Sequence, residues 1–423
     1  MRPLTDNPIS RPEDDAFHFE PYVTVLHEAV AQATPLPLTV GVFGSWGTGK
    51  SSFLKLWEER FEREKVPTIW FNPWKYDQKV EVWAALLHTI LAELEKEEKL
   101  GEKARRLARA ATWLSVRAGL GAATALGTGG VIKGEAVDQM LQDIAVRDSE
   151  QYRQINRFES DFAKAVKEFV GDEGRLVVFV DDLDRCTPES AMTVLESLKL
   201  FLAETQCVFV LALDLDVLAA VATNKFGEAL KGAPAEVVSG LAYLDKIVQL
   251  PFFLPDVGFD TLRAAYGTAI PEFEDLAFFW GLLQHSLGNN PRRLKRYLNV
   301  LSMALAVTRA QTGRAPSSEF RLQLAMLLIF RTRYRSFFHH LAAEPDSWRV
   351  LASYFARARE EPRNAAAFRT GFSGALLAFA LDTDLENMLT YGGPDAVVSP
   401  DGPDVLAMIS TLRRTAGPDA APE

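Results

Sequence analysis

The chain has 423 residues, of which 48% are hydrophobic and 24% are charged, and its formal net charge is −10. This length accommodates two or three domains with sizeable cores, and the acidic balance argues against a broad surface that follows nucleic-acid phosphates. Its two cysteines, Cys186 and Cys207, are too few for a disulfide framework or a multi-cysteine zinc site. The polar segment from Met1 to Glu20 lacks the apolar region of a signal peptide. We therefore expect a protein of the reduced cytoplasm.

Helical and strand-like segments alternate along the first half of the chain. We expect helices at 21–33, 51–64, 80–98 and through Phe158, Phe162, Val166 and Phe169, and strands at 38–43, 68–71, 176–180, 207–213 and 247–250. Short continuous apolar runs are typical of strands that are covered on both faces. The sequence therefore predicts an α/β fold with a mostly parallel five-stranded sheet, whose ligand lies at the carboxyl ends of the strands.

A complete phosphate-binding loop, G-x-x-x-x-G-K-[ST], follows the strand predicted at 38–43. The loop consists of Gly44, Ser45, Trp46, Gly47, Thr48, Gly49, Lys50 and Ser51, and Ser52 continues into the next helix. Its glycines allow backbone N–H groups to turn toward phosphate oxygens, and the following helix presents its positive N-terminus to the anion. We expect Lys50 to reach the β- and γ-phosphates of a nucleotide and Ser51 to hold Mg²⁺.

Acidic residues follow the buried strand predicted at 176–180, in the order Asp181-Asp-Leu-Asp-Arg-Cys186. This is a Walker B arrangement, in which Asp181 is expected to accept from a water on Mg²⁺. Asp182 stands where many ATPases carry a glutamate that activates the attacking water. An aspartate is shorter by one methylene, which reduces its reach to that water and favours slow hydrolysis.

The sequence lacks two motifs that are typical of Ras-like GTPases, and this bears on the identity of the nucleotide base. A Ras-like GTPase would carry D-x-x-G after its strand, whereas Asp181 is followed by Asp-Leu-Asp. It would also carry N-K-x-D for guanine, whereas Asn224-Lys225 is followed by Phe-Gly. We therefore expect ATP as the nucleotide.

The chain is predicted to be helical from about Asp256, with phenylalanine and leucine at helical spacing. One helix begins with Asn290 as its N-cap and Pro291 at its first position. Its basic face consists of Arg292, Lys295, Arg296 and Asn299. Such a face near a helix start can receive an anion, or it can be a solvated face whose stems pack on neighbouring residues. Nucleic-acid binding at Arg292 to Arg296 is a third alternative, and it would be salt-sensitive and independent of nucleotide.

Four stretches together carry a specific resemblance. They are TVGVFGSWGTGKSS (39–52), WFNPWKYD (70–77), VDDLDRC (180–186) and NPRRLKRYLN (290–299). In this order they resemble the KAP family of P-loop NTPases, and the segment 243–252 is similar to the final core strand of that family. The resemblance extends over roughly residues 6 to 300 and is more specific than the phosphate loop alone.

The resemblance implies an additional-strand ATPase core with the strand order 5-1-4-3-2 and a helical C-terminal extension. It assigns Lys50 and Ser51 to the phosphates and Mg²⁺, and Asp181 and Asp182 to the Walker B acids. Arg292 or Arg293 matches the C-terminal arginine pair of the family, which would sense the γ-phosphate from a lid.

Arg185 matches the arginine of the family's D-D-x-D-R motif, and two roles for it stay open. As a finger that acts across a subunit boundary of a homo-oligomer, such an arginine contributes about 10³ to 10⁵ in rate. Alternatively, Arg185 pairs with Asp182 or Asp184 and fixes the loop.

We predict five segments along the chain. They are a first part of the NTPase core (1–99), an insertion (100–150), the rest of the core (151–255), a helical lid (256–345) and a helical extension with a disordered tail (346–423). Many relatives carry membrane-spanning helices in the insertion. Here the only candidate, 111–132, contains Arg117 and five glycines, and an arginine near the centre of a span costs about 2.5 to 3.5 kcal/mol. We expect a soluble insertion, with membrane contact through 103–132 as the alternative.

Two classes of function follow from these features. In the first, ATP hydrolysis assembles or rearranges a protein complex, and the resemblance implies a role in bacterial anti-phage defence. In the second, the protein is a slowly hydrolysing ATP-gated switch or scaffold that exposes a surface to a protein partner.

Overall fold

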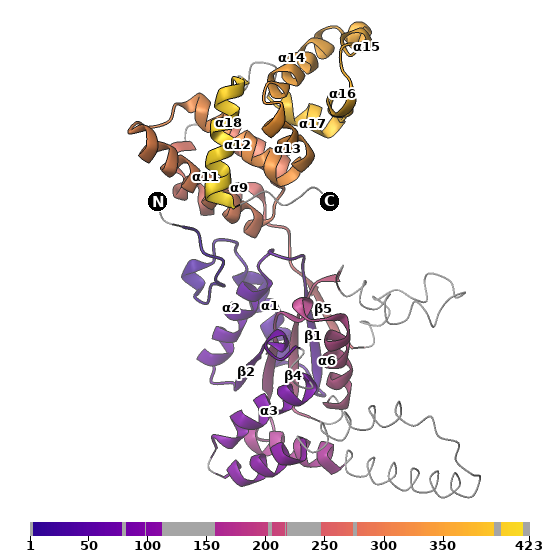
Figure 1. Cartoon of the computed structure of the whole chain (residues 1–423). Coiled ribbons are helices and arrows are strands. Elements are labelled where there is room, and N and C mark those ends of the chain that lie inside the picture. Colours follow the sequence, from indigo (N-terminus) through magenta and orange to yellow (C-terminus); the bar gives the residue numbers. More distant parts are fainter. Residues whose placement is uncertain are drawn as a thin grey trace, which may run out of the picture. The chain divides into compact units, whose positions relative to one another are not determined.

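The computed structural model describes residues 3–77, 82–97, 99–111, 157–201, 205–215, 217, 247–273, 277–392 and 399–417. The chain divides into two compact units, which are labelled by element in Figure 1. One unit is Pro8–Pro255, and the other combines Met1–Asn7 with Asp256–Glu423. Residues 3–7, which belong to the segment predicted as the first part of the NTPase core, thus pack with the C-terminal half of the chain.

The unit Pro8–Pro255 is built on one parallel sheet. Its strands are β1 (Leu38–Phe43), β2 (Thr68–Phe71), β3 (Leu176–Val180), β4 (Cys207–Leu213) and β5 (Leu250–Phe253). They are arranged in the order β2-β3-β4-β1-β5, and all neighbouring pairs are parallel. Read from the other edge this is 5-1-4-3-2, so the predicted α/β fold and strand order are confirmed. β4 separates the strand before the phosphate loop from the strand before Asp181.

Helices cover both faces of this sheet. α1 (Glu20–Ala31) and α2 (Lys50–Arg63) pack on one face through residues such as Val23 and Trp57. α3 (Val82–Glu95), α6 (Pro188–Phe201) and the helical segments 101–111 and 157–170 pack on the other. Because β3 and β4 are buried at every position, their sequences are continuous apolar runs instead of alternating ones.

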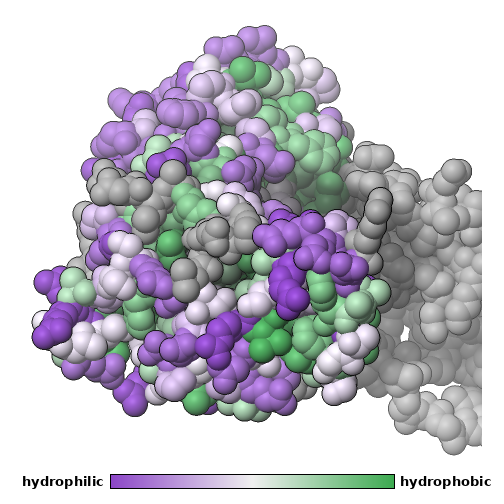
Figure 2. Space-filling model, turned by 90° about the horizontal axis from the view of Figure 1, so that it is seen from above, coloured by the Kyte–Doolittle hydropathy of each residue, from purple (hydrophilic) through white to green (hydrophobic). Residues whose placement is uncertain are grey.

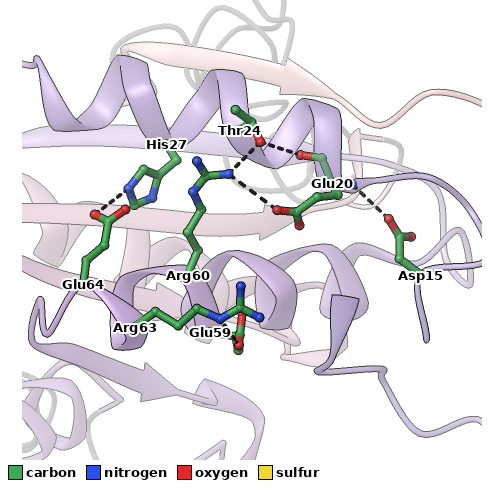
Figure 3. A network of polar contacts seen from close by, with 8 residues as sticks. All are labelled: Asp15, Glu20, Thr24, His27, Glu59, Arg60, Arg63 and Glu64. Carbon is green, nitrogen blue, oxygen red and sulfur yellow. Dashed lines mark hydrogen bonds and ion pairs between the residues drawn. The ribbon is translucent and has the colours of Figure 1, made fainter. Parts of the chain in front are cut away.

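Polar contacts join α1 to α2 beside their apolar interface (Figure 3). The Arg60 guanidinium donates to the Thr24 hydroxyl at 2.6 Å and lies 3.5 Å from the Glu20 carboxylate. The His27 ring meets Glu64 at 2.9 Å, and the Asp15 carboxylate accepts from the Glu20 amide at the start of α1. The contacts of Arg60 and Glu64 hold α1 against α2, the helix that follows the phosphate loop.

The last strand differs from its predicted position. The sequence analysis placed it at 247–250 and treated Pro251 as its end, whereas β5 is Leu250–Phe253 and includes that proline. β5 is an edge strand that pairs only with β1, with Pro251 opposite Gly41. A proline is accommodated there because an edge strand has one side without ladder hydrogen bonds, so a missing N–H on that side breaks nothing.

The described part of the second unit is helical, as predicted. Its helices are α9 (Phe259–Tyr266), α10 (Ala277–Leu287), α11 (Pro291–Thr312), α12 (Ser318–Arg333), α13 (Arg335–Ala343), α14 (Ser347–Glu360), α15 (Ala365–Phe368), α16 (Gly374–Ala380), α17 (Thr383–Leu389) and α18 (Gly402–Ala416). α18 contacts α11, α12 and α13, so the segments predicted as a lid and an extension pack together. On the face shown in Figure 2, hydrophilic and hydrophobic residues are interspersed.

No helix within the described ranges is both long enough and apolar enough to cross a membrane. Residues 101–111 are helical and pack on the sheet unit through Ala104, Leu107 and Ala111. The rest of the segment 103–132, for which membrane contact was considered, lies outside the described residues.

Candidate nucleotide site

The phosphate loop connects the carboxyl end of β1 to the start of α2. Gly49, which precedes α2, has a φ of 111°, and Gly47 has a φ of 88°, values that side chains disfavour. The Gly44 amide donates to the carbonyl of Leu213 at the end of β4, which anchors the loop to the neighbouring strand. The backbone therefore makes the tight turn that the G-x-x-x-x-G-K-S pattern predicts, and it precedes the positive end of a fourteen-residue helix.

The side chains of the loop form local contacts. The Thr48 hydroxyl donates to the Ser45 carbonyl at 2.8 Å, and the Ser52 hydroxyl accepts from the amide of Ile9 at 3.3 Å. Trp46 is about half exposed at the tip of the loop. These contacts stiffen the turn, and they anchor the segment before α1 to the first turn of α2.

Lys50 is buried beneath the loop. Its ammonium donates to the carbonyls of Gly44 at 2.7 Å and Ser45 at 3.3 Å. It also lies 3.3 Å from the carboxylate of Asp184, whose side chain is 8% exposed. The ammonium is thus directed to the inside of the loop, where a phosphate-binding lysine is required, and it is held there by an acidic residue.

Asp181 lies next to Ser51. It follows β3, its amide donates to the Phe71 carbonyl at the end of β2, and its carboxylate lies near the Ser51 side chain. Burial raises the pKa of Asp181 above its ordinary value, as do the nearby carboxylates of Asp182 and Asp184, while the nearby Ser51 hydroxyl opposes this rise. The geometry brings together the two residues that sequence reasoning assigned to Mg²⁺.

Asp182 has an unusual backbone and a carboxylate that is bound at both oxygens. Its φ is 60°, a left-handed conformation that aspartate tolerates better than most residues. One oxygen lies 2.7 Å from the Arg185 guanidinium, and the other accepts from the Asn72 side-chain amide at 2.7 Å. The side chain that is the candidate base is therefore fixed by two donors of its own chain.

Arg185 lies on the short 3₁₀ turn Leu183–Arg185 that follows Asp182. Its side chain is about one third exposed, and its guanidinium lies 5.5 Å from the ring centre of Trp74. Of the two roles left open for Arg185, the geometry of the single chain corresponds to the pair with Asp182.

Sequence reasoning assigned no role to Asn72 or Asp184. Asn72 directly follows β2, which neighbours β3 in the sheet, so the carboxyl ends of both strands bring it to Asp182. The strand order was therefore a signal that could have identified Asn72. Asp184 was noted only as an alternative partner of Arg185, whereas it pairs with Lys50; the 3₁₀ turn that directs it there has no clear sequence pattern.

The residues at this place fit a magnesium ion. Mg²⁺ prefers oxygen ligands and usually keeps several waters, with one or two carboxylates and substrate phosphates completing its shell. Ser51 and Asp181 supply a hydroxyl and a buried carboxylate that lie near each other. Among the described residues, no group of three or more His, Cys, Asp or Glu side chains could hold a metal by itself.

Arg292 and Arg293 belong to the second unit, at the start of α11. Asn290 caps this helix by accepting from the Arg293 amide at 3.0 Å, as predicted. The Arg293 guanidinium donates to the carbonyl of Leu287 at the end of α10, whereas the Arg292 guanidinium lies 3.7 Å from the Asp6 carboxylate. The two neighbours thus differ: Arg293 caps a helix, and Arg292 faces an anionic group.

A parallel sheet in this order, with a glycine-rich loop after β1 and an acidic pair after β3, defines a P-loop NTPase, a class of nucleotide-binding proteins. The model of the KAP family P-loop domain matches residues 19–308. The chain therefore belongs to the KAP family of P-loop NTPases, which confirms the resemblance stated above.

Two solved structures are similar to the chain at low identity. The ORC1 protein of Aeropyrum pernix, in complex with DNA, is 13% identical with a TM-score of 0.38, over 93% of this chain and 92% of that one. Cdc6p of Pyrobaculum aerophilum is 11% identical with a TM-score of 0.39, over 98% and 97%. TM-scores this low carry no argument about function. No curated protein matches the chain.

Proposed function

We propose that the chain binds ATP with Mg²⁺ at the loop 44–51 and hydrolyses it, and that this cycle assembles or rearranges a protein complex. The observation that carries the proposal is the convergence of Lys50, Ser51 and Asp181 at the carboxyl ends of β1 and β3. A lysine, a hydroxyl and a carboxylate at this point match the chemistry of phosphoryl transfer, in which positioning and charge stabilisation supply most of the rate.

Each residue has a role in this proposal. Lys50 and the loop amides bind the β- and γ-phosphates, and Ser51 and Asp181 would hold Mg²⁺. The ion, when bound, neutralises charge that develops on the transferred phosphoryl group. Asp182 accepts a proton from the attacking water. Arg292 is the proposed phosphate-sensing residue of the second unit, and Arg293 supports it by fixing the end of α10.

The second candidate function, an ATP-gated switch or scaffold, is favoured by the state of Asp182. Its two carboxylate oxygens already accept from Asn72 and Arg185, so both are engaged by donors of the same chain. An aspartate whose carboxylate must break two hydrogen-bonded contacts before it reaches the attacking water is expected to give slow turnover. In that case the bound nucleotide, and not its hydrolysis, carries the signal to a partner.

The wider role is proposed from the family alone. Bacterial KAP proteins are associated with phage exclusion, so we propose a component of anti-phage defence that acts on another protein, within a homo-oligomer. Nucleic acid is the weaker alternative, because Asp6 lies against Arg292 and Arg296 and reduces the positive charge of that face. A cytoplasmic location stays a prediction, with contact to a membrane through 103–132 as the alternative.

The test combines mass and turnover in the same samples. The mass of the purified protein is measured without nucleotide, with ATP and Mg²⁺, and with ADP, while phosphate release is followed. Assembly that requires ATP, with turnover that rises with protein concentration, would support the first function. A constant mass with tight ATP binding and very slow turnover would support the switch.

Two variants make this test specific. Asp182→Asn is expected to bind ATP with unchanged affinity and to lose hydrolysis, because it removes the proton acceptor but keeps the shape. Asp172→Asn is the control, since Asp172 is an exposed partner of Lys167 on the surface of the same unit. Normal hydrolysis by the Asp182 variant would refute the assigned base, and absence of ATP binding by the unsubstituted protein would refute the proposed function.

A further inference from the structure

The basic face of α11 is occupied by a segment of the same chain. Both belong to the unit formed by Met1–Asn7 and Asp256–Glu423. The Leu4 amide donates to the side-chain oxygen of Asn299 at 2.8 Å, and the side-chain nitrogen of Asn299 donates to the Leu4 carbonyl at 2.7 Å. The side-chain amide of Asn299 thus binds both the N–H and the C=O of Leu4, as the backbone of a neighbouring β-strand would.

The contacts continue along the helix toward its start. The Lys295 ammonium donates to the Thr5 carbonyl at 3.0 Å. The Asp6 carboxylate lies 3.3 Å from the Arg296 guanidinium and 3.7 Å from that of Arg292. Residues 4 to 6 therefore run antiparallel to α11.

The spacing of the two partners explains this register. An extended chain advances about 7 Å in two residues, which equals between four and five residues of an α-helix at 1.5 Å each. The contact residues 292, 295, 296 and 299 share one helix face at intervals of three and four. A short peptide that ends in an acidic residue therefore fits this face along its length.

Three cations of α11 gather at the end where Asp6 lies. The Asp6 carboxylate faces Arg292 and Arg296, and Lys295 is the next cation on the same face. Burial lowers the pKa of Lys295, Asp6 raises it and Arg292 lowers it again. The Lys295 ammonium also lies 5.5 Å from the ring centre of Tyr266 on α9. The site has main-chain binding groups at one end and a cluster of cations that pairs with Asp6 at the other.

We propose that this face of α11 is a binding site with two mutually exclusive ligands: the chain's own Leu4–Asp6 segment, and a phosphate group that displaces the Asp6 carboxylate from Arg292 and Arg296. This proposal rests on the proposed function, because it names the group that Arg292 binds in the absence of a nucleotide. Asp6 stands in for a phosphate because a carboxylate and a phosphate oxygen are equivalent acceptors for a guanidinium. Phosphate binding and release of the segment are then one equilibrium.

The size of the coupling follows from the exposure of the ion pair. The Asp6 side chain is 35% exposed, and that of Arg296 is 60% exposed. Exposed pairs contribute roughly 0.2 to 1 kcal/mol, so removal of the Asp6 charge should strengthen ATP binding about 1.4- to 5-fold. The two bonds of Asn299 to Leu4 should contribute more, so Asn299→Ala should raise the open population of the segment about 10- to 30-fold.

The first experiment measures hydrogen exchange of the peptide that contains residues 4–7. Asp6→Asn and Asn299→Ala should both accelerate its exchange. The matched control is Asp14→Asn, because Asp14 is an acidic residue near the same end of the chain and pairs with the exposed Arg11. Asp14→Asn should leave exchange and ATP affinity unchanged. Equal exchange in all four proteins would overturn the proposal.

The second experiment separates this proposal from the proposed function by using inorganic pyrophosphate and Lys50→Ala protein. Pyrophosphate should accelerate exchange of residues 4–7 severalfold, with or without Lys50, whereas sodium chloride at the same ionic strength should not. An effect equal to that of the chloride would show only screening and would overturn the proposal. If ATP binds the loop but Asp6→Asn binds it no more tightly than the unsubstituted protein, the proposal fails while the nucleotide site stands.

Discussion

The ammonium of Lys50 and the carboxylate of Asp184 lie 3.3 Å apart, and their side chains are 9% and 8% exposed. The lysine of the phosphate loop is therefore neutralised by an acidic residue that comes three positions after the first Walker B aspartate. A nucleotide that binds Lys50 must compete with this pair, and its phosphates must tolerate the Asp184 charge nearby.

We expect Asp184→Asn to bind ATP more tightly and to be less stable without it. Removal of the charge leaves the buried Lys50 without an anionic partner, which should cost about 1 to 3 kcal/mol in the free energy of unfolding. A phosphate would then supply the missing charge, so the dissociation constant for ATP should fall about 5- to 30-fold. Calorimetric titration and thermal unfolding, with and without ATP, measure both effects. Weaker ATP binding would instead mean that Asp184 supports the nucleotide-bound state.

Asp181→Asn should stabilise the nucleotide-free fold while it abolishes metal-dependent hydrolysis. The pKa of Asp181 is raised, mainly by burial, so the native state holds its proton more firmly than the unfolded state does. Stability then falls as pH rises from about 4, the ordinary pKa of an aspartate, to the higher native pKa, and is constant above it. The Asp181→Asn variant has no ionisable group at this position, so it does not lose stability in this way as the pH rises. The difference in melting temperature between variant and unsubstituted protein should therefore grow over that pH range; a difference that shrinks would contradict the burial argument.

Gly49→Ala should impair both stability and nucleotide binding. Gly49 has a φ of 111°, and a Cβ there would lie 3.0 Å from the ring of the buried Phe19. Gly171→Ala is the matched control, because Gly171 has a φ of 83° with no atom within 4 Å of an added Cβ. The left-handed conformation alone should cost about 1 to 2 kcal/mol in both variants, and crowding should add about 1 to 3 kcal/mol at Gly49. Urea unfolding gives the two values, and equal losses would show that the loop accommodates the methyl group.

Arg185→Ala should retain ATP binding, and its hydrolysis rate separates the two functions. The rate falls about tenfold if the Arg185 donor positions Asp182 as the base, and it rises if Asp182 must leave that donor to reach the water. Loss of a finger from another subunit would instead reduce the rate by about 10³ to 10⁵. When Arg185→Ala is mixed with Lys50→Ala, phosphate release should equal the sum of the separate proteins. Recovery of activity in the mixture would establish that the arginine acts across a subunit boundary.

Much of the sheet unit could be predicted because its signals are local. β1, β2, β3 and β4 have the bounds expected from the sequence. β3 and β4 are the clearest cases, since strands that are buried on both faces need apolar residues at every position. β5 was misplaced because the rule that a proline ends a strand does not hold at a sheet edge. The strand order itself came from the family resemblance and not from the residues.

The contacts between residues far apart in sequence could not be predicted in this way. The pair of Lys50 with Asp184 depends on a 3₁₀ turn that directs one of several acidic side chains inward. The pair of Asn72 with Asp182 depends on which strands are neighbours. The contact of residues 4–6 with α11 depends on the fold of the whole second unit, and a polar segment of this kind has no apolar periodicity to reveal its partner.

The hydrogen bonds between Asn299 and Leu4 can form only late in the synthesis of the chain on the ribosome. The two residues are 295 positions apart in the chain. At about 5 to 20 residues per second, roughly 15 to 60 s of synthesis separate them. The intervening Pro8–Pro255 unit can fold in that interval while residues 4–6 still lack their partner helix. The contact between Leu4 and Asn299 can therefore form only in a nascent chain in which translation has passed α11. Before that moment the phosphate loop has been synthesised but the second unit is incomplete.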